Sequence, residues 1–444
     1  MLNYIWLALV LLSVAIGGWN DRLKDVTNGA FDGAKTAVTI ALGLIGVMAL
    51  WLGVMRLAEK AGLIQKIAHA LRPIMRRLFP DVPAEHPAMG SMLMNMAANM
   101  LGLGNAATPL GLRAMRDLET LNPRPGVATN AMCTFLALNT SSVQLIPTTA
   151  IALLVAAGST RPTAIVGTAL LATLCAATVA LITVKLLEKL PMFRIRPAAS
   201  KVDDSNAPPV ATEVDEPTFT EPAVPRAPVW GKLILIALTL FFLGLFLRMV
   251  FPAMFQLAPS AEAATQNVFV RSVNALSLLA IPFLISFFPT YAAVRGIKVY
   301  DEFVEGAKEG FNVILRIIPF LVTMLVAINM FKGAGGIELL ARVLAPVLEP
   351  LNFSPDLLPL ALMRPLSGGA TLAILTDIIH RLGPESIVSL TAATIYGSTE
   401  TTFYVAAVYF GSIGIRQTRH AIPAGLLADA TGVVASVIIC RAVL

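Results

Sequence analysis

The sequence is poor in charged residues, cysteine and histidine. Only 14% of its 444 residues are Asp, Glu, Lys or Arg, whereas 56% are hydrophobic, and the mean hydropathy is +0.76. This composition excludes a soluble globular domain. The three cysteines lie in apolar stretches and the four histidines lack metal-ligand spacing. We therefore expect neither a disulfide framework nor a metal site.

Sequence motifs of soluble enzymes are also missing. The chain contains no Gly-x-x-x-x-Gly-Lys-[Ser/Thr], no His-Glu-x-x-His and no Cys-x-x-Cys. We expect no enzyme activity and no cofactor, and a membrane-embedded enzyme is the least favoured alternative because no nucleophile and base are arranged. The net charge of +6 comes from basic residues in loops that flank apolar runs. That placement indicates membrane topology rather than nucleic-acid binding.

Long apolar runs dominate the chain instead. A helix of about 20 residues crosses the hydrocarbon core of a bilayer. The predicted spans are 2–18, 36–57, 126–157, 161–187, 230–252, 268–290, 312–331, 386–411 and 418–442. The first run lacks a charged start and a good cleavage site, so we expect it to be retained rather than removed as a signal peptide. The sequence thus predicts a multi-pass protein of the lipid bilayer.

The two halves of the chain share a pattern. The residues Asp-Gly-Ala-Lys at 32–35 return as Glu-Gly-Ala-Lys at 305–308, and the same spacing relates Leu-Arg-Pro at 71–73 to Leu-Ala-Pro at 344–346. Further along, a shorter spacing relates Asn-Thr-Ser-Ser at 139–142 to Gly-Ser-Thr-Glu at 397–400. Duplicated apolar units with polar residues at equivalent places are typical of membrane transport proteins.

Residues 197–229 separate two halves, 1–196 and 230–444. This stretch is rich in Pro, Ala and acidic residues, which predicts a disordered linker. Basic residues gather in 58–87, whereas 253–267 contains no Lys or Arg. The positive-inside rule then places 58–87 and the linker in the cytoplasm and 253–267 outside.

Two segments, 88–118 and 357–380, are interrupted by Gly and Pro. Non-helical backbone at membrane depth is tolerated only where protein or a wet cavity surrounds it, so we predict a re-entrant hairpin in each half. The crossings then place the halves in opposite orientations. The predicted fold is an all-α polytopic membrane protein of two inverted-topology repeats. Ordinary kinked spanning helices are the alternative, and they would make the repeats parallel.

Polar residues cluster at the hairpin tips and where the apolar runs 126–157 and 386–411 are interrupted. Polar groups at the midplane are costly unless paired, and repeat-built transporters bind their substrates there. The alternative is that these side chains only bond within or between helices. The predicted solute-binding residues are Asn99, Asn105, Thr108, Asn139, Thr140, Ser141, Ser142, Arg364, Ser367, Thr371, Ser398 and Thr399.

Charges within apolar segments occur in the second half only. Arg364 and Glu400 are the expected ion pair, and Glu400, Asp429 and Asp377 are candidates for ion coupling. A static structural ion pair is the alternative, and Asp377 could also lie in solvent at a hairpin end. The spacing that relates 139–142 to 397–400 places Leu171 opposite Asp429, so the charge is not symmetric.

Several stretches resemble known families. Phe-Asp-Gly-Ala-Lys at 31–35, Arg-Arg-Leu-Phe-Pro at 76–80 and 134–142 resemble spore maturation protein A. Arg-Pro-Leu-Ser-Gly at 364–368 and Tyr-Gly-Ser-Thr-Glu-Thr at 396–401 resemble spore maturation protein B. The chain resembles a fusion of the two, whose "gate" or nucleoside-recognition domain is shared with concentrative nucleoside transporters and a ferrous-iron transporter. The resemblance implies a permease-like fold in the bacterial plasma (inner) membrane, without a settled substrate.

These observations together predict a secondary transporter of a small polar solute, nucleoside-like or a small organic anion, working by alternating access. In this hypothesis Arg364 holds an anionic or carbonyl group of the solute, and Glu400 pairs with it or carries a proton. A non-transporting membrane scaffold that recruits partners is the alternative. The sequence is also compatible with a homo-oligomer.

Overall fold

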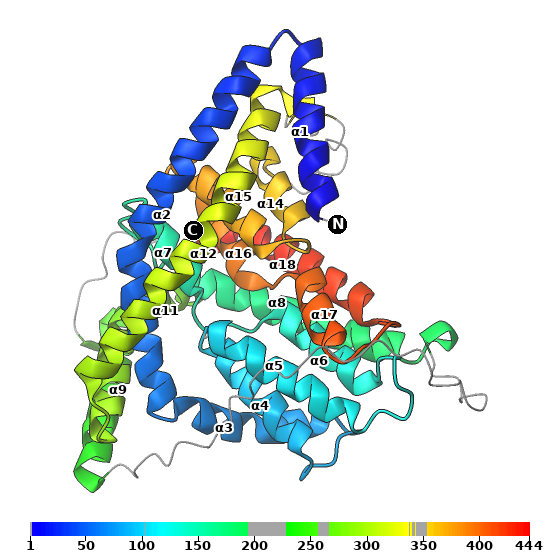
Figure 1. Cartoon of the computed structure of the whole chain (residues 1–444). Coiled ribbons are helices and arrows are strands. Elements are labelled where there is room, and N and C mark those ends of the chain that lie inside the picture. The colour runs from blue at the N-terminus through cyan, green and yellow to red at the C-terminus, as the bar shows by residue number, and fades with distance from the viewer. Residues whose placement is uncertain are drawn as a thin grey trace.

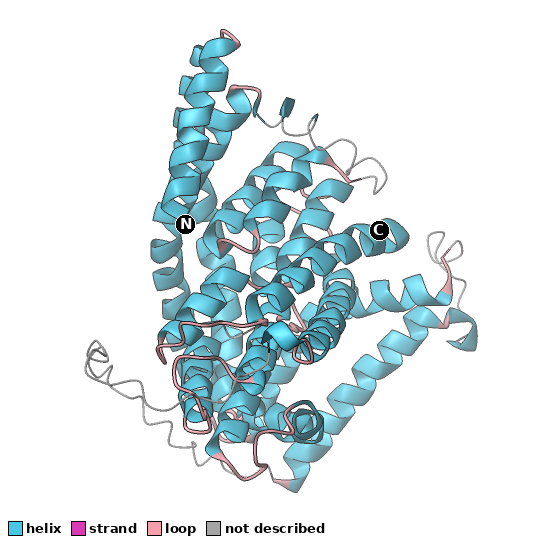
Figure 2. Cartoon of the chain, turned by 90° about the vertical axis from the view of Figure 1, so that its right-hand side faces the viewer, coloured by secondary structure: helices cyan, strands magenta, loops and turns pink. Residues whose placement is uncertain are grey.

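The computed structural model describes residues 2–102, 104–193, 228–255, 266–336, 338–339, 342 and 353–444. The linker predicted at 197–229 lies almost entirely outside the described residues, so its structure stays a prediction. Regular structure in the described ranges is helical, with one isolated bridge between Val127 and Gln417 (Figure 2). The all-α prediction is therefore confirmed.

The helices of each half follow in chain order (Figure 1). The first half contains α1 (Leu2–Trp19), α2 (Leu23–Lys60), α3 (Leu63–Leu78), α4 (Pro87–Met100), α5 (Gly104–Glu119), α6 (Asn130–Ser141), α7 (Thr148–Ala156), α8 (Ile165–Leu187) and η1 (Pro191–Phe193). The second half contains α9 (Val229–Val250), η2 (Pro252–Phe255), α11 (Val268–Val294), α12 (Val299–Gly333), η3 (Pro355–Leu357), α14 (Leu358–Met363), α15 (Gly368–Leu382), α16 (Ile387–Ser398), α17 (Thr402–Gly411) and α18 (Ala421–Val443).

Five of these helices, α2, α8, α9, α11 and α18, are long and apolar enough to cross a membrane. The protein is therefore a multi-pass membrane protein. The predicted spans 2–18 and 312–331 fall within the helices α1 and α12.

The predicted spans 126–157 and 386–411 are each broken in two, as their polar clusters indicate. In the first, Ser142 ends α6 with a left-handed φ of 37°, and Pro147, which has no backbone N–H, precedes α7. In the second, Thr399 ends α16 with extended backbone, and α17 begins at Thr402. Neither run is a single continuous helix. Each break leaves polar backbone groups inside an apolar region.

The longest helices, α2 and α12, lie side by side in antiparallel register along one edge of the molecule (Figure 1). A Cβ placed on Gly33 would lie 2.6 Å from the carbonyl oxygen of Leu325, and one on Gly306 would lie 2.6 Å from that of Leu52. The spacing that relates 32–35 to 305–308 makes Gly33 equivalent to Gly306 and Leu52 equivalent to Leu325. Each half therefore makes the same contact with the other half. Such reciprocal contacts are expected when a two-fold axis relates the two helices.

The central helices repeat this reciprocity, because α6 packs on α18 while α16 packs on α8. Helices α8 and α18 both have 23 residues, so they can be aligned from end to end. They cross closely, since a Cβ on Gly432 would lie 3.7 Å from that of Ala176. Aligning their first residues places Thr173 opposite Asp429, rather than Leu171 as the spacing in the sequence predicts.

The segments predicted as hairpins are pairs of helices joined by a short turn. Helices α4 and α5 pack on each other around Gly102, which has a φ of +74° that favours glycine. In the second half, α14 and α15 are joined across 364–367, and Ser367 caps α15 by accepting a hydrogen bond from the backbone N–H of Ala370 at 3.2 Å.

The loops at the helix starts also pair reciprocally. The N–H of Ala128 donates to the carbonyl of Gln417 at 3.0 Å. At the equivalent junction of the repeat, Glu385 accepts hydrogen bonds from the Ser159 hydroxyl at 2.7 Å, the Thr160 N–H at 2.7 Å and the Arg161 side chain at 3.2 Å. One junction is closed by backbone groups and the other by a carboxylate.

The Glu385 junction predicts a defined response to acid. Partial burial raises the pKa of Glu385, but the hydrogen bonds from Ser159, Thr160 and Arg161 outweigh it and hold the pKa at about 2, below the ordinary 4.5. The junction therefore stabilises the fold above pH 4.5, and this contribution is lost as the pH falls toward 2. We expect Glu385→Gln to flatten the acid limb of a plot of melting temperature against pH. Parallel limbs for the two proteins would contradict this account.

Candidate functional site

The two helix breaks meet at the centre of the molecule. The backbone N–H of Glu400, in the α16–α17 break, donates to the carbonyl of Thr140 at 2.6 Å at the end of α6. The Thr173 hydroxyl, from α8, donates to the carbonyls of Ser141 at 2.7 Å and Ser142 at 3.0 Å. The polar clusters of the two halves are thus in direct contact, and protein groups satisfy part of their backbone.

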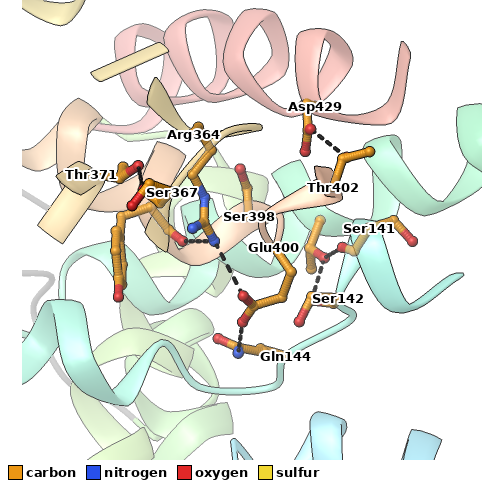
Figure 3. Close-up of polar contacts among 12 residues, drawn as sticks. Ser141, Ser142, Gln144, Arg364, Ser367, Thr371, Ser398, Glu400, Thr402 and Asp429 are labelled. Atoms are coloured by element: carbon orange, nitrogen blue, oxygen red, sulfur yellow. Dashed lines mark hydrogen bonds and ion pairs between the residues drawn. The ribbon is translucent and has the colours of Figure 1, made fainter. Parts of the chain in front are cut away.

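The structure brings together the two charges that the sequence analysis paired. Arg364, only 2% exposed, places Nη2 at 4.0 Å from Oε2 of Glu400 (Figure 3). The same guanidinium donates to the carbonyl of Tyr396 at 2.9 Å and lies 4.8 Å from the centre of the Tyr396 ring. Arg364 therefore contacts protein groups on two sides, its buried Nε has no partner among the described residues, and it is not among the residues that line the cavity described next.

Beside Glu400 lies a cavity of about 200 Å³. The Gln144 side chain lines it and donates to Oε1 of Glu400 at a long 3.5 Å (Figure 3). Its walls include the aromatic rings of Trp51, from α2, and Tyr396, from α16. Trp51 is 5% exposed, and its buried indole N–H has no hydrogen-bond partner among the described residues. An unsatisfied buried donor beside a loosely held carboxylate is a place for a ligand.

Three of these residues, Gln144, Trp51 and Tyr396, are not among those predicted from the sequence. Trp51 sits within an apolar run, and its only signal is that a large ring with a polar N–H occurs there. Tyr396 directly precedes the polar cluster that contains Glu400. Of the predicted residues, Glu400 is the one that lines the cavity. The rotation of a helix about its own axis decides which of its apolar residues faces a cavity. The polar residues that interrupt the apolar runs do not reveal this rotation.

The predicted hairpin-tip amides bond to one another and to the protein. Asn99 donates to the side-chain oxygen of Asn139 at 2.8 Å, and the Tyr409 hydroxyl donates to the same oxygen at 3.3 Å. Asn95 donates to the carbonyl of Ala107 at 2.8 Å. This network ties the α4–α5 hairpin to α6 and α17, which favours the alternative of hydrogen bonds that join helices. Thr108, on α5, is half-buried and also makes contacts.

Apart from Ser367, which caps α15, the remaining predicted solute-binding residues divide into three groups. The hydroxyls of four of them bond within the chain one turn back, as the alternative predicts, and these are Thr140, Ser141, Thr371 and Ser398. The hydroxyls of Ser142 and Thr399 are buried without a partner among the described residues. The side chain of Asn105 lies outside the described residues.

Asp377 and Asp429 occupy different environments. Asp377 lies near Arg381, with Nε at 3.5 Å from Oδ2, and lines an open depression with His380. Asp377 is not among the residues that line the central cavity. Asp429 is 2% exposed on α18 and accepts a hydrogen bond from the Thr402 hydroxyl at 2.6 Å (Figure 3).

These features define a helical membrane protein built around two broken, reciprocally packed helix sets. A family model described as nucleoside recognition, the Gate domain, matches residues 41–158 and 314–416. The longer spacing of the repeat relates the first residues of the two matches, 41 and 314, and the shorter spacing relates their last residues, 158 and 416. The chain is 48% identical to spore maturation protein A of Bacillus subtilis over 174 residues, which are 39% of this chain and 89% of that protein. It is 44% identical to spore maturation protein B of the same organism over 167 residues, 38% of this chain and 94% of that protein.

The chain therefore belongs to the spore maturation protein A and B family of Gate-domain membrane proteins, with the two relatives matching it as parts of a fused protein.

Proposed function

We propose that the protein is a secondary transporter of a small polar solute that is neutral or cationic, and that the solute binds in the cavity between the helix breaks. The observation that carries the proposal is the cavity itself. It is lined by Glu400, whose carboxylate is held only by contacts of 3.5 and 4.0 Å, and by Trp51, whose buried N–H has no partner among the described residues. Both groups would gain a partner when a solute binds.

The size and charge of the cavity narrow the solute class. Its volume of about 200 Å³ is below the roughly 300–1,000 Å³ of pockets for drug-sized ligands. The lining includes two aromatic residues, Trp51 and Tyr396, and an acceptor in Glu400. A planar, nitrogen-rich solute about the size of a nucleobase fits this chemistry. A small organic anion fits poorly, because Glu400 repels it and Arg364 is not among the residues that line the cavity.

The reciprocal packing supports inverted repeats and alternating access. A two-fold axis that relates antiparallel α2 and α12 must run perpendicular to them. If these helices cross the bilayer, the axis lies in the membrane plane, which is the arrangement of inverted-topology transporters. The α4–α5 and α14–α15 pairs would then be re-entrant hairpins that move with their halves. In this arrangement the protein resides in the bacterial inner membrane with its linker in the cytoplasm.

A binding screen tests the proposed function. Purified full-length protein would be heated with nucleobases, nucleosides, amino acids, amines and dicarboxylates. We expect nucleobase-like or cationic compounds to raise the melting temperature, and dicarboxylates to leave it unchanged. Trp51→Phe keeps an aromatic wall but removes the indole N–H, so it should weaken the response about tenfold in apparent affinity, as for one lost hydrogen bond.

The same compounds would then be tested for uptake into proteoliposomes. Binding without uptake would contradict transport and favour the scaffold alternative. No response to any compound in either assay would contradict the solute site.

A further inference from the structure

A second polar site lies on the opposite side of the α16–α17 break, around Asp429. Oδ2 of Asp429 accepts a hydrogen bond from Thr402, but Oδ1 is buried and has no partner among the described residues. The hydroxyl of Thr399, itself 2% exposed, is buried and lacks a partner in the same way. Two oxygen atoms with free lone pairs are thus enclosed in this region of the protein.

The local backbone is shaped to place these oxygens together. Thr399 is extended, with φ −143° and ψ 171°, so successive side chains point to opposite sides. Figure 3 shows Glu400 directed toward Gln144 and away from Asp429. The Thr399 hydroxyl lies near the carboxylate of Asp429 without meeting the geometry of a hydrogen bond to it. A Cβ on Gly432 would lie 2.6 Å from Cγ2 of Thr399, so the break lies directly on α18, close to the carboxylate.

The charge of Asp429 is not balanced by the protein around it. Among the described residues it forms no ion pair within 4 Å, and Arg364 and Glu400 are charged groups that act on it from farther away. Those two have opposite signs and already face each other. A buried carboxylate without a positive partner is costly, so the site needs a bound cation or a proton.

The first half of the chain indicates that the carboxylate is not needed for the fold. The equivalent position there is Thr173, whose neutral hydroxyl donates to two carbonyls of the α6–α7 break. A hydroxyl therefore suffices to anchor a break on its neighbouring helix. A negative charge at this position occurs in the second half alone. Anchoring the helix break therefore does not explain why Asp429 is a carboxylate.

We propose that Asp429, Thr399 and Thr402 bind a monovalent alkali cation on the side of the break opposite the solute cavity. Oxygen donors with a single carboxylate suit a hard ion of one positive charge. No group of three or more His, Cys, Asp or Glu side chains that could hold a metal ion occurs in the described ranges, which argues against a transition metal here. Discontinuous helices bind coupling ions in other membrane transporters.

The cation would act on the solute site through the break itself. Thr399 and Thr402 flank Glu400, so ordering them around an ion also orders the carboxylate in the cavity. Ion and solute would then raise each other's affinity by the same factor. This consequence rests on the proposed function, whereas cation binding itself does not.

Melting temperatures of the full-length protein without solute test the site. Lithium, sodium or potassium chloride would replace N-methylglucamine chloride at constant pH and ionic strength. We expect one of these alkali cations to raise the melting temperature in a saturable way, and Asp429→Asn and Thr399→Val to abolish the rise. Asp377→Asn, which removes a carboxylate far from the site, should keep it.

If Asp429→Asn does not fold, equilibrium binding of radioactive sodium or rubidium to wild type and Thr399→Val gives the same answer. Stabilisation that follows pH but no alkali cation would overturn the proposal in favour of a proton on Asp429. A cation response that survives both substitutions would overturn it as well. Because no solute is present, neither result bears on the cavity at Glu400.

Discussion

Glu400→Gln is expected to abolish solute uptake by proteoliposomes while the protein remains folded. Glu400 supplies the negative charge that lines the cavity, and the amide that replaces it offers one acceptor and two unwanted donors. Its contacts to Arg364 and Gln144 are long, at 4.0 and 3.5 Å, and its side chain is 41% exposed. The loss of these long contacts leaves the buried Arg364 without its facing carboxylate, so the melting temperature should fall while the protein stays folded.

Uptake of the solute identified by thermal shift would be measured for wild type, Glu400→Gln and a control. Glu305→Gln is a suitable control because Glu305 is an exposed carboxylate on α12 that pairs with Lys308 on the same helix. It should transport like wild type. Wild-type uptake by Glu400→Gln would remove Glu400 from the mechanism and leave the cavity without its main recognition group.

Gly33→Val is expected to destabilise the protein severely, by about 3 kcal/mol or more, at the upper end of overpacking effects. The added Cβ would lie 2.6 Å from a backbone carbonyl oxygen of Leu325, and a backbone atom in a packed helix cannot rotate away. Gly306→Val should cost a similar amount, because it makes the equivalent contact with Leu52. Melting temperature and monodispersity in detergent would report both effects.

Gly46→Ala on the same helix is the matched control. A Cβ at Gly46 would meet nothing within 4 Å. The variant should therefore be neutral or slightly stabilising, by up to about 1 kcal/mol, since Ala favours helix over Gly. Tolerance of Gly33→Val would contradict the close α2–α12 contact. A large difference between Gly33→Val and Gly306→Val would contradict its reciprocity.

Much of the fold is determined by local features of the sequence. The apolar runs fix the membrane class, because a chain with so few charges cannot remain in water. The positions of both helix breaks follow from short polar clusters, around Ser142 and around Thr399, that offer the backbone other hydrogen bonds. The duplication is visible as two spacings between similar stretches, which the two Gate-domain matches reproduce.

The choice of residues for the proposed site depends on the tertiary structure. Asn99 and Asn139 looked like solute ligands, but the fold brings them together, so they satisfy each other. Trp51 looked like an ordinary apolar residue, yet the rotation of α2 turns it toward the cavity. Sequence shows which residues are polar and where a helix must end. Which polar atoms remain without a partner depends on contacts between segments far apart in the chain, and only the packed structure sets these.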